Sequence, residues 1–161
     1  MPDLVLVGAT ILMGLAAGLF YGFSCAVMPG LRATDDRTFV SVMQRINAAI
    51  LNGWFAIVFG GAPVAMVLAA GLQWSHEGNR EVLPWILAAL LLDLLMILIT
   101  MRINVPMNEA LAAADVSTDA RILAALRARF ETKWVRWNNL RALIATAAFC
   151  CLVCGTVWYS A

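Results

Sequence analysis

Four stretches of the chain are apolar over lengths that suit a membrane-spanning helix. They cover roughly residues 4–28, 48–72, 84–103 and 140–159. A spanning helix needs about 20 mainly apolar residues, which each stretch provides. The stretches are continuously apolar and do not alternate, so they do not fit the strands of a β-barrel. The pattern predicts an all-α integral membrane protein, a four-transmembrane-helix bundle in which each helix satisfies its own backbone groups.

Two segments between these stretches have one apolar face and one polar face. Within residues 31–47, capping residues at Thr34 to Asp36 precede a helix whose apolar stripe is Phe39, Val42, Met43 and Ile46. A second helix follows a turn at residues 115–118, and its stripe is Ile122, Leu123, Leu126, Phe130, Trp134 and Trp137. We expect both amphipathic helices to lie at the membrane surface or at the mouth of the bundle, and the second to continue into the last span.

The composition supports a membrane environment. Hydrophobic residues make up 63% of the 161 residues and charged residues 13%, whereas a soluble domain carries about 25% charged residues. This excludes a soluble globular fold, intrinsic disorder and a coiled coil. A net charge of +1 offers no basic field for nucleic acid. No linker or internal repeat divides the chain, so residues 1–161 are interpreted as a single membrane domain.

The distribution of basic residues predicts the orientation in the membrane. Ten of the eleven lie within residues 31–47 and 102–141, whereas the loop after the second span holds only Arg80. Because short cytoplasmic loops are enriched in Lys and Arg, we expect these two segments, with their amphipathic helices, on the cytoplasmic side and both termini outside. A single Lys among the eleven suits a GC-rich bacterial genome, and a bacterial cytoplasmic membrane is the expected location.

Cysteine and histidine give little support for metal or cofactor chemistry. Cys25, Cys150, Cys151 and Cys154 lie inside spans and lack the spacing and partner histidines of a zinc or haem site. We interpret them as small packing residues. The only histidine, His76, falls in the outer loop, where a solvated role is expected. The sequence therefore predicts neither a metal nor a cofactor.

Asp93 is the residue that costs most to place in the membrane. A carboxylate in the middle of a span costs at least about 2.5–3.5 kcal/mol, so we expect Asp93 to face the bundle interior. Its role is open between a base, a proton relay or pocket lining on one side and a structural hydrogen bond on the other.

Polar side chains gather where the spans meet the basic side. Steps of three and four place four residues on one helix face: Trp134, Trp137, Asn138 and Arg141. Amides from the other segments lie at the same depth, namely Gln44, Asn47, Asn104 and Asn108, and Pro106 is expected to break its helix there. Such a set can bind an anionic or phenolic aromatic ligand, because amides and Arg contact oxygens while Trp stacks. The alternative is that these residues cap helices and extend to lipid headgroups.

Three glycines in the first span, Gly14, Gly18 and Gly22, recur every four residues. Small residues at this spacing let two helices approach closely in lipid. The spacing fits packing within the bundle, and it also fits a seam between two copies in a homo-oligomer.

Four runs of residues resemble the anthrone-oxygenase-like family of small integral membrane proteins, whose bacterial members mostly carry a domain of unknown function. The runs are residues 20–31 ending in MPGL, residues 43–47 (MQRIN), residues 104–108 (NVPMN) and residues 134–141 (WVRWNNLR). The resemblance implies a four-helix membrane bundle. For fungal relatives it also implies oxidation of an anthrone to an anthraquinone by O2, with no evident cofactor.

The resemblance suggests roles for the polar residues. Donors to a developing oxyanion would be Asn104, Asn108, Asn138 and Arg141. The substrate would contact Trp134, Trp137, Gln44 and Asn47. Asp93 is a weaker candidate for the base, since 11 residues of helix place it about 16 Å from Asn104. The competing hypotheses are a non-catalytic membrane protein that binds a lipid, a quinone or a partner helix, and a small transporter, which the lack of an internal repeat disfavours.

Labelling of introduced cysteines tests the orientation. In a cysteine-free parent, a cysteine at Gly78 should react with a membrane-impermeant maleimide on intact cells. A cysteine at Asp119 should react only after the membrane is opened. The opposite pattern would overturn the assignment.

Overall fold

The computed structural model describes residues 2–75, 80–116 and 119–160, and within these residues the regular structure is entirely helical. His76, Gly78 and residues 117–118 lie outside the described residues. The α-helices are α1 (Pro2–Gly22), α2 (Met28–Arg32), α3 (Asp36–Ala49), α4 (Gly53–Ser75), α5 (Leu83–Ile99), α6 (Val105–Ala112) and α7 (Ala120–Ser160). A 3-10 turn, Arg80–Val82, precedes α5, and two π-helical turns, Phe23–Val27 and Thr100–Asn104, join α1 to α2 and α5 to α6.

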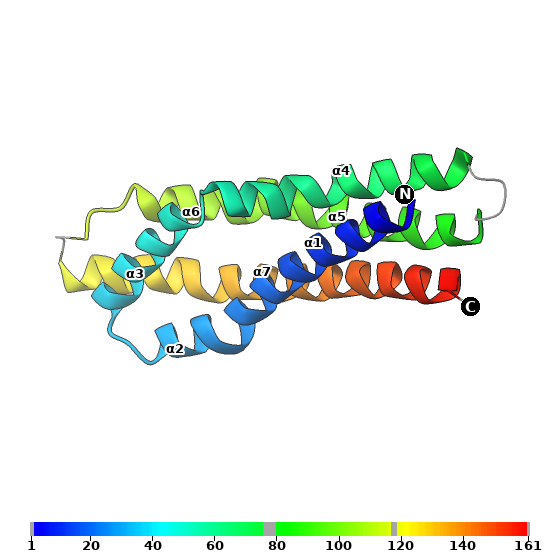
Figure 1. Ribbon diagram of the computed structural model, residues 1–161. Coiled ribbons are helices and arrows are strands. Elements are labelled where there is room, and N and C mark those ends of the chain that lie inside the picture. The colour runs from blue at the N-terminus through cyan, green and yellow to red at the C-terminus, as the bar shows by residue number, and fades with distance from the viewer. Residues whose placement is uncertain (1, 76–79, 117–118, 161) are drawn as a thin grey trace.

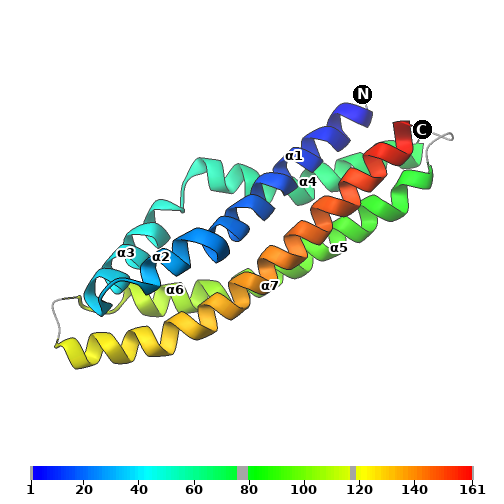
Figure 2. The ribbon, with the colours of Figure 1, turned by 90° about the horizontal axis from the view of Figure 1, so that it is seen from below.

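Four helical segments are long and apolar enough to cross a membrane, which confirms the predicted fold class. They are Asp3–Arg32, Gly53–Ser75, Arg80–Ala112 and Ala120–Val157. Helix α1 packs against α4 and α7, and α5 packs against the same two helices. Both chain termini lie at one end of the bundle, and α2, α3 and α6 lie at the other (Figures 1 and 2). The first amphipathic segment is α3, and the second is continuous with the last span in α7, as predicted.

The interior of the bundle combines alanines with larger apolar side chains. Many of its fully buried positions are alanines, among them Ala9, Ala62, Ala69, Ala89, Ala145 and Ala148, and Met13, Met66 and Ile86 fill the space between them. Other large aliphatic side chains face outward, for example Leu87, Leu91 and Leu98 on α5. Close backbone approach through small residues, with large apolar residues outside, is typical of helices packed in lipid.

The second span begins later than the apolar pattern predicts. Residues 48–49 complete α3, and α4 starts at Gly53. Asn52 explains this boundary, because its side-chain amide donates to Ala49 O (2.8 Å) and its Oδ1 accepts from Phe55 N (3.0 Å). One side chain therefore closes α3 and caps α4.

The expectation that Pro106 breaks its helix is wrong. Met28 N–H donates to Phe23 O, and Val105 N–H donates to Thr100 O, so each π-turn shifts the hydrogen-bond register by one residue. A proline then occupies the second position of the following helix, as Pro29 in α2 and Pro106 in α6. The missing proline N–H falls where the ladder has already shifted, and the helix continues.

The prediction that the cysteines are packing residues holds for one of the four. Cys151 is partly buried and packs against the core of the bundle. Cys25, Cys150 and Cys154 are exposed on η1 and α7 instead, where an uncharged thiol suits lipid as well as a methyl group does.

Gly14 allows a close contact inside the bundle. A Cβ atom at this position would lie 3.0 Å from Cε2 of Phe149 on α7, whereas Gly18 and Gly22 have nothing within 4 Å of theirs. Close helix packing is therefore confirmed for Gly14, within one chain. A seam between copies through Gly18 and Gly22 stays a prediction.

Substitutions by leucine separate these two kinds of glycine. Gly14→Leu should lower the free energy of unfolding by about 1–3 kcal/mol, because its side chain must displace the Phe149 ring. Gly18→Leu is the matched control and should melt like the parent in detergent. If Gly18→Leu instead turned a dimer into a monomer in size-exclusion chromatography, Gly18 would lie at a seam between copies.

Candidate functional site

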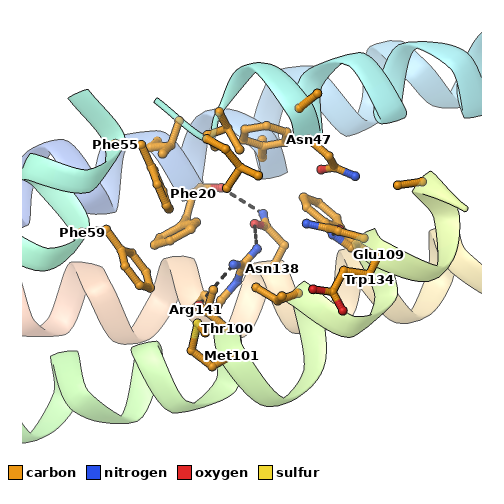
Figure 3. Close-up of a pocket in the computed structure, with 18 of the residues that line it drawn as sticks. Phe20, Asn47, Phe55, Phe59, Thr100, Met101, Glu109, Trp134, Asn138 and Arg141 are labelled. Carbon is orange, nitrogen blue, oxygen red and sulfur yellow. Dashed lines mark hydrogen bonds between the residues drawn. The ribbon is translucent and has the colours of Figure 1, made fainter. Parts of the chain in front are cut away.

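A cavity of about 580 Å³ lies toward the α3 end of the bundle. Its walls come from α1, α3, α4, α6, α7 and both π-turns, and aromatic rings cover much of it (Figure 3). The rings are Phe20, Phe23, Phe55, Phe59 and Trp134. Phe55 and Phe59 are stacked with centroids 5.0 Å apart, and Trp134 lies 5.6 Å from Phe23. A volume between about 300 and 1,000 Å³ with mainly apolar walls is typical of a small-molecule site.

Of the described residues on the cavity wall, Arg141 is the only one with a basic side chain, and just 5% of its surface is exposed. Its Nη2 donates to Asn138 Oδ1 (2.9 Å) and its Nη1 to Thr100 Oγ1 (3.3 Å). Its Cζ lies 4.5 Å from the ring centroid of Phe20 and 5.7 Å from that of Trp134. In the described part of the chain no salt bridge includes Arg141, and its Nε has no hydrogen-bond partner. The cavity wall therefore contains a cation held only by neutral groups.

Asn138 fixes the position of this cation. Its Nδ2 donates to Phe20 O (3.0 Å) and to Ser24 Oγ (2.9 Å), while its Oδ1 accepts from Arg141. Thr100 Oγ1 in turn donates to Met96 O (2.8 Å). The pair Asn138–Arg141 thus connects α7 to α1 and its π-turn on one side and to the second π-turn on the other. Figure 3 shows the bonds to Phe20 and Thr100.

Further polar groups line the cavity from α3 and α6. Asn108 Oδ1 accepts from Trp134 Nε1 (2.8 Å), which orients the indole. Glu109 supplies a carboxylate to the lining, and Asn47 supplies an amide whose buried Nδ2 has no hydrogen-bond partner in the parts of the chain that the structure describes. Gln44 Nε2 donates to two carbonyls at the end of α6, Leu111 O (2.8 Å) and Ala114 O (2.9 Å).

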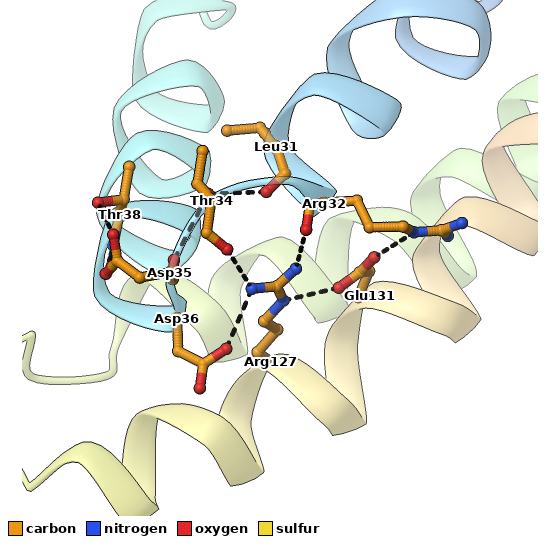
Figure 4. Close-up of polar contacts among 8 residues, drawn as sticks. All are labelled: Leu31, Arg32, Thr34, Asp35, Asp36, Thr38, Arg127 and Glu131. Atoms are coloured by element: carbon orange, nitrogen blue, oxygen red, sulfur yellow. Dashed lines mark hydrogen bonds and ion pairs between the residues drawn. The ribbon is translucent and has the colours of Figure 1, made fainter.

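A polar cluster holds the start of α3 against α7. Arg127 Nε donates to Glu131 Oε2 (2.8 Å), and its Nη1 donates to Asp36 Oδ1 (3.0 Å) and Thr34 O (2.8 Å). Arg127 Nη2 donates to Arg32 O (2.9 Å), and Arg32 Nε donates back to Glu131 Oε1 (2.8 Å) (Figure 4). Together with Gln44, these bonds attach both ends of α3, so one wall of the cavity is fixed from two sides.

Helix α3 begins at an acidic cap. Asp35 Oδ1 accepts from Thr38 N (3.0 Å), and the Thr38 hydroxyl donates to the same carboxylate. The Thr38 hydroxyl, and secondly its amide, lower the pKa of Asp35. This contribution to helix stability is present at neutral pH and is lost as the pH falls through the lowered pKa.

Six of the predicted site residues line the cavity, and three do not. The six are Gln44, Asn47, Asn108, Trp134, Asn138 and Arg141. Trp137 lines a separate groove on the other side of α6, so the expectation that it shares one face with the cavity residues is wrong. Asn104 is 1% exposed but lies outside the lining, and neither polar atom of its amide has a hydrogen-bond partner within residues 2–75, 80–116 and 119–160.

Asp93 faces the bundle interior, as expected, with 1% of its surface exposed. It does not line the cavity, and neither of its carboxyl oxygens has a hydrogen-bond partner among the described residues. The structure thus gives no support to the alternative of a structural hydrogen bond.

Sequence reasoning missed several residues of the lining. The rings of Phe20, Phe23, Phe55 and Phe59 lie within apolar stretches, where nothing in the pattern separates a cavity wall from a lipid-facing side. Glu109 follows the NVPMN run directly and could have been found, because an acidic residue beside that run lies at the depth of the other polar groups.

Comparison with protein families decides the relationship. The family model described as "Anthrone oxygenase" matches residues 51–151, which is more than half of the chain. The chain belongs to the anthrone oxygenase family. The match includes α4 from its start, α5, α6 and most of α7, and so covers Phe55, Phe59, Thr100, Glu109 and Arg141 of the cavity. Searches of curated proteins and of solved structures gave no match.

The isolated carboxyl group of this anthrone oxygenase family member gives a test of stability. Asp93→Leu should raise the free energy of unfolding by about 1–3 kcal/mol, because it removes a buried polar group that lacks a partner. Thermal melting in detergent measures the change. The melting temperature of Asp93→Asn should lie between those of the parent and the Leu variant. A destabilised Leu variant would show that Asp93 has a partner in the membrane.

Proposed function

We propose that the cavity binds a lipophilic polycyclic aromatic of the anthrone type and that the protein oxidises it with O2. The observation that carries the proposal is the buried Arg141, whose hydrogen bonds go to neutral acceptors only. A buried cation is costly unless a charge or several hydrogen bonds compensate it. A ligand that carries or develops a negative oxygen would complete this site, and Arg is suited to such a group.

The cavity walls support a flat aromatic ligand. Phe55 and Phe59 offer a stacked pair of rings from α4, and Phe20 and Trp134 flank the guanidinium. Aromatic groups gain from offset or edge contacts with such rings beyond the area they bury. A fused ring system can therefore lie among these side chains with its oxygen toward Arg141.

The first step is removal of a proton. An anthrone has a CH2 group opposite its carbonyl, and loss of one of these protons places a negative charge on the carbonyl oxygen. Glu109 is the carboxylate that lines the cavity, and we assign it the role of base. Arg141 stabilises the oxyanion as it forms. Asn138 is a positioning residue, since its amide hydrogens are already donated to Phe20 O and Ser24 Oγ.

The remaining steps balance without an external reductant. The carbanion transfers an electron to O2, and the two radicals combine to form a C–O bond. Protonation gives a hydroperoxide at that carbon. Loss of the second C–H proton and cleavage of the O–O bond form the new ketone and release water. One oxygen atom of O2 ends in the anthraquinone and the other in water, and the CH2 carbon supplies all four electrons.

We further propose a location in the bacterial cytoplasmic membrane, with the cavity end facing the cytoplasm. The basic residues support this orientation, because they concentrate on α2, α3 and the first part of α7. A lipophilic substrate would then reach the cavity at the cytoplasmic leaflet.

Substitutions of Arg141 and Glu109 test the function. Arg141→Met keeps an unbranched apolar chain but removes the guanidinium and with it a charge-assisted contact of about 1.5–3 kcal/mol, so kcat/KM should fall roughly 10- to 150-fold. Arg141→Lys should recover only part of the lost kcat/KM, because it restores the charge but not the planar group that contacts the oxygen. Glu109→Gln should lower kcat more than it raises KM. The assay follows anthraquinone formation from anthrone in membranes under air, against membranes without the protein and against nitrogen.

Matched controls separate the site from the rest of the chain. Arg136→Met changes an exposed arginine of the same helix. Two further controls, a protein with all four cysteines replaced by Ala and the variant His76→Gln, leave the cavity lining unchanged. These proteins should retain parental turnover. If the parent bound anthraquinone but oxidised anthrone no faster than empty membranes, the protein would be a binding protein and the catalytic proposal would fail.

A further inference from the structure

A second depression lies on the other side of α6 from the cavity. This groove has a volume of about 360 Å³ and shares no lining residue with the cavity. Among the described residues that line it, two are basic, Arg102 in the π-turn and Lys133 on α7, and none is acidic. Its remaining wall is formed by uncharged side chains, including Pro106, Met107 and Trp137.

The two basic side chains are available to a ligand. Both residues are exposed, and no salt bridge in the described part of the chain includes either of them. Glu131, two residues before Lys133, is already held by Arg32 and Arg127, and Glu109, next to Ala110, lines the cavity and not the groove. The groove is therefore a positive site with an apolar floor.

The position of the groove fits the boundary of the bilayer. Arg102 lies in the π-turn three residues after the apolar helix α5 ends, and from there the groove extends along α6 to Ala110, eight residues later. Eight helical residues span about 12 Å, which reaches from the edge of the hydrocarbon region into the headgroup region. The partly buried indole of Trp137 suits this depth, where Trp is enriched.

We propose that this groove binds one anionic phospholipid. The phosphate lies between Arg102 and Lys133, and an acyl chain lies against Met107, Pro106 and Trp137. Basic pockets between membrane helices are suited to anionic headgroups. Free phosphate would use only the two cations, whereas a phospholipid also covers the apolar wall, and the lipid is therefore the occupant that fits the whole groove.

Native mass spectrometry of the purified protein tests the proposal. The protein is titrated with phosphatidylglycerol or phosphatidylcholine in detergent, and the bound lipid is counted. One phosphatidylglycerol should bind more tightly than phosphatidylcholine of the same chain length. Arg102→Gln with Lys133→Gln should weaken phosphatidylglycerol binding about 30-fold, since each basic side chain near an anionic surface contributes about fivefold.

Three further arms make the result decisive. Arg121→Gln with Arg129→Gln removes two exposed charges of α7 outside the groove and should leave the affinity unchanged. Ala110→Trp fills the groove without changing its charge and should abolish the preference, which keeps the test valid if the double Gln variant fails to fold by circular dichroism. Glycerol 1-phosphate in 100-fold excess should not displace the lipid. Equal affinity for both lipids, equal losses in the Arg121/Arg129 control, or displacement by glycerol 1-phosphate would each overturn the proposal.

Discussion

The structure depends on keeping one guanidinium group inside a membrane bundle. Arg141 is nearly fully buried, and isolated charges in such a place cost several kcal/mol. Asn138 and Thr100 accept its hydrogen bonds, and the rings of Phe20 and Trp134 face it. These partners come from three of the four spanning segments, so the bundle must be assembled before the charge can be accommodated. Neutral acceptors leave the charge itself unopposed, which favours a ligand with a negative oxygen.

The wall formed by α3 explains how a cavity can persist beside this group. Helix α3 is short and amphipathic, and its apolar side packs on α7 through Phe39, which lies 6.3 Å from Phe130 between ring centroids. Arg127 and Glu131 hold its beginning, and Gln44 holds a position near its end by bonding to the carbonyls that close α6. These bonds hold α3 in place from its polar side. The helix can therefore cover the aromatic side chains of the cavity without moving inward to fill the space between them.

The sequence predicted the fold well, because the apolar stretches leave no alternative to spanning helices. It predicted the site in part. Trp137 was placed with Trp134 and Asn138, yet steps of three and four rotate a helical position by about 60° one way and about 40° the other. Adjacent residues therefore end about 100° apart, with Asn138 on the cavity and Trp137 on the groove. Asn104 was expected in the site but lies outside the cavity lining. It ends a π-turn, and the extra residue of that turn rotates its side chain relative to its direction in a regular α-helix. Phe55 and Phe59 carried no signal, because lipid and an aromatic ligand favour the same side chains.

Each of the two π-turns acts as a phase shift of one residue in a long helix. If residues 100–104 instead formed a regular α-helix without loss of a residue, Pro106 would meet an unbroken ladder, and every residue beyond it would turn by about 100°. Asn108 and Glu109 would leave the cavity while the apolar stretch stayed long enough to cross the membrane. A change that makes such a turn α-helical is thus far more damaging to a binding site than its small effect on hydropathy suggests. To keep its binding site, such a short membrane protein has to preserve the direction in which each side chain leaves the helix, and hydrophobicity alone does not ensure this.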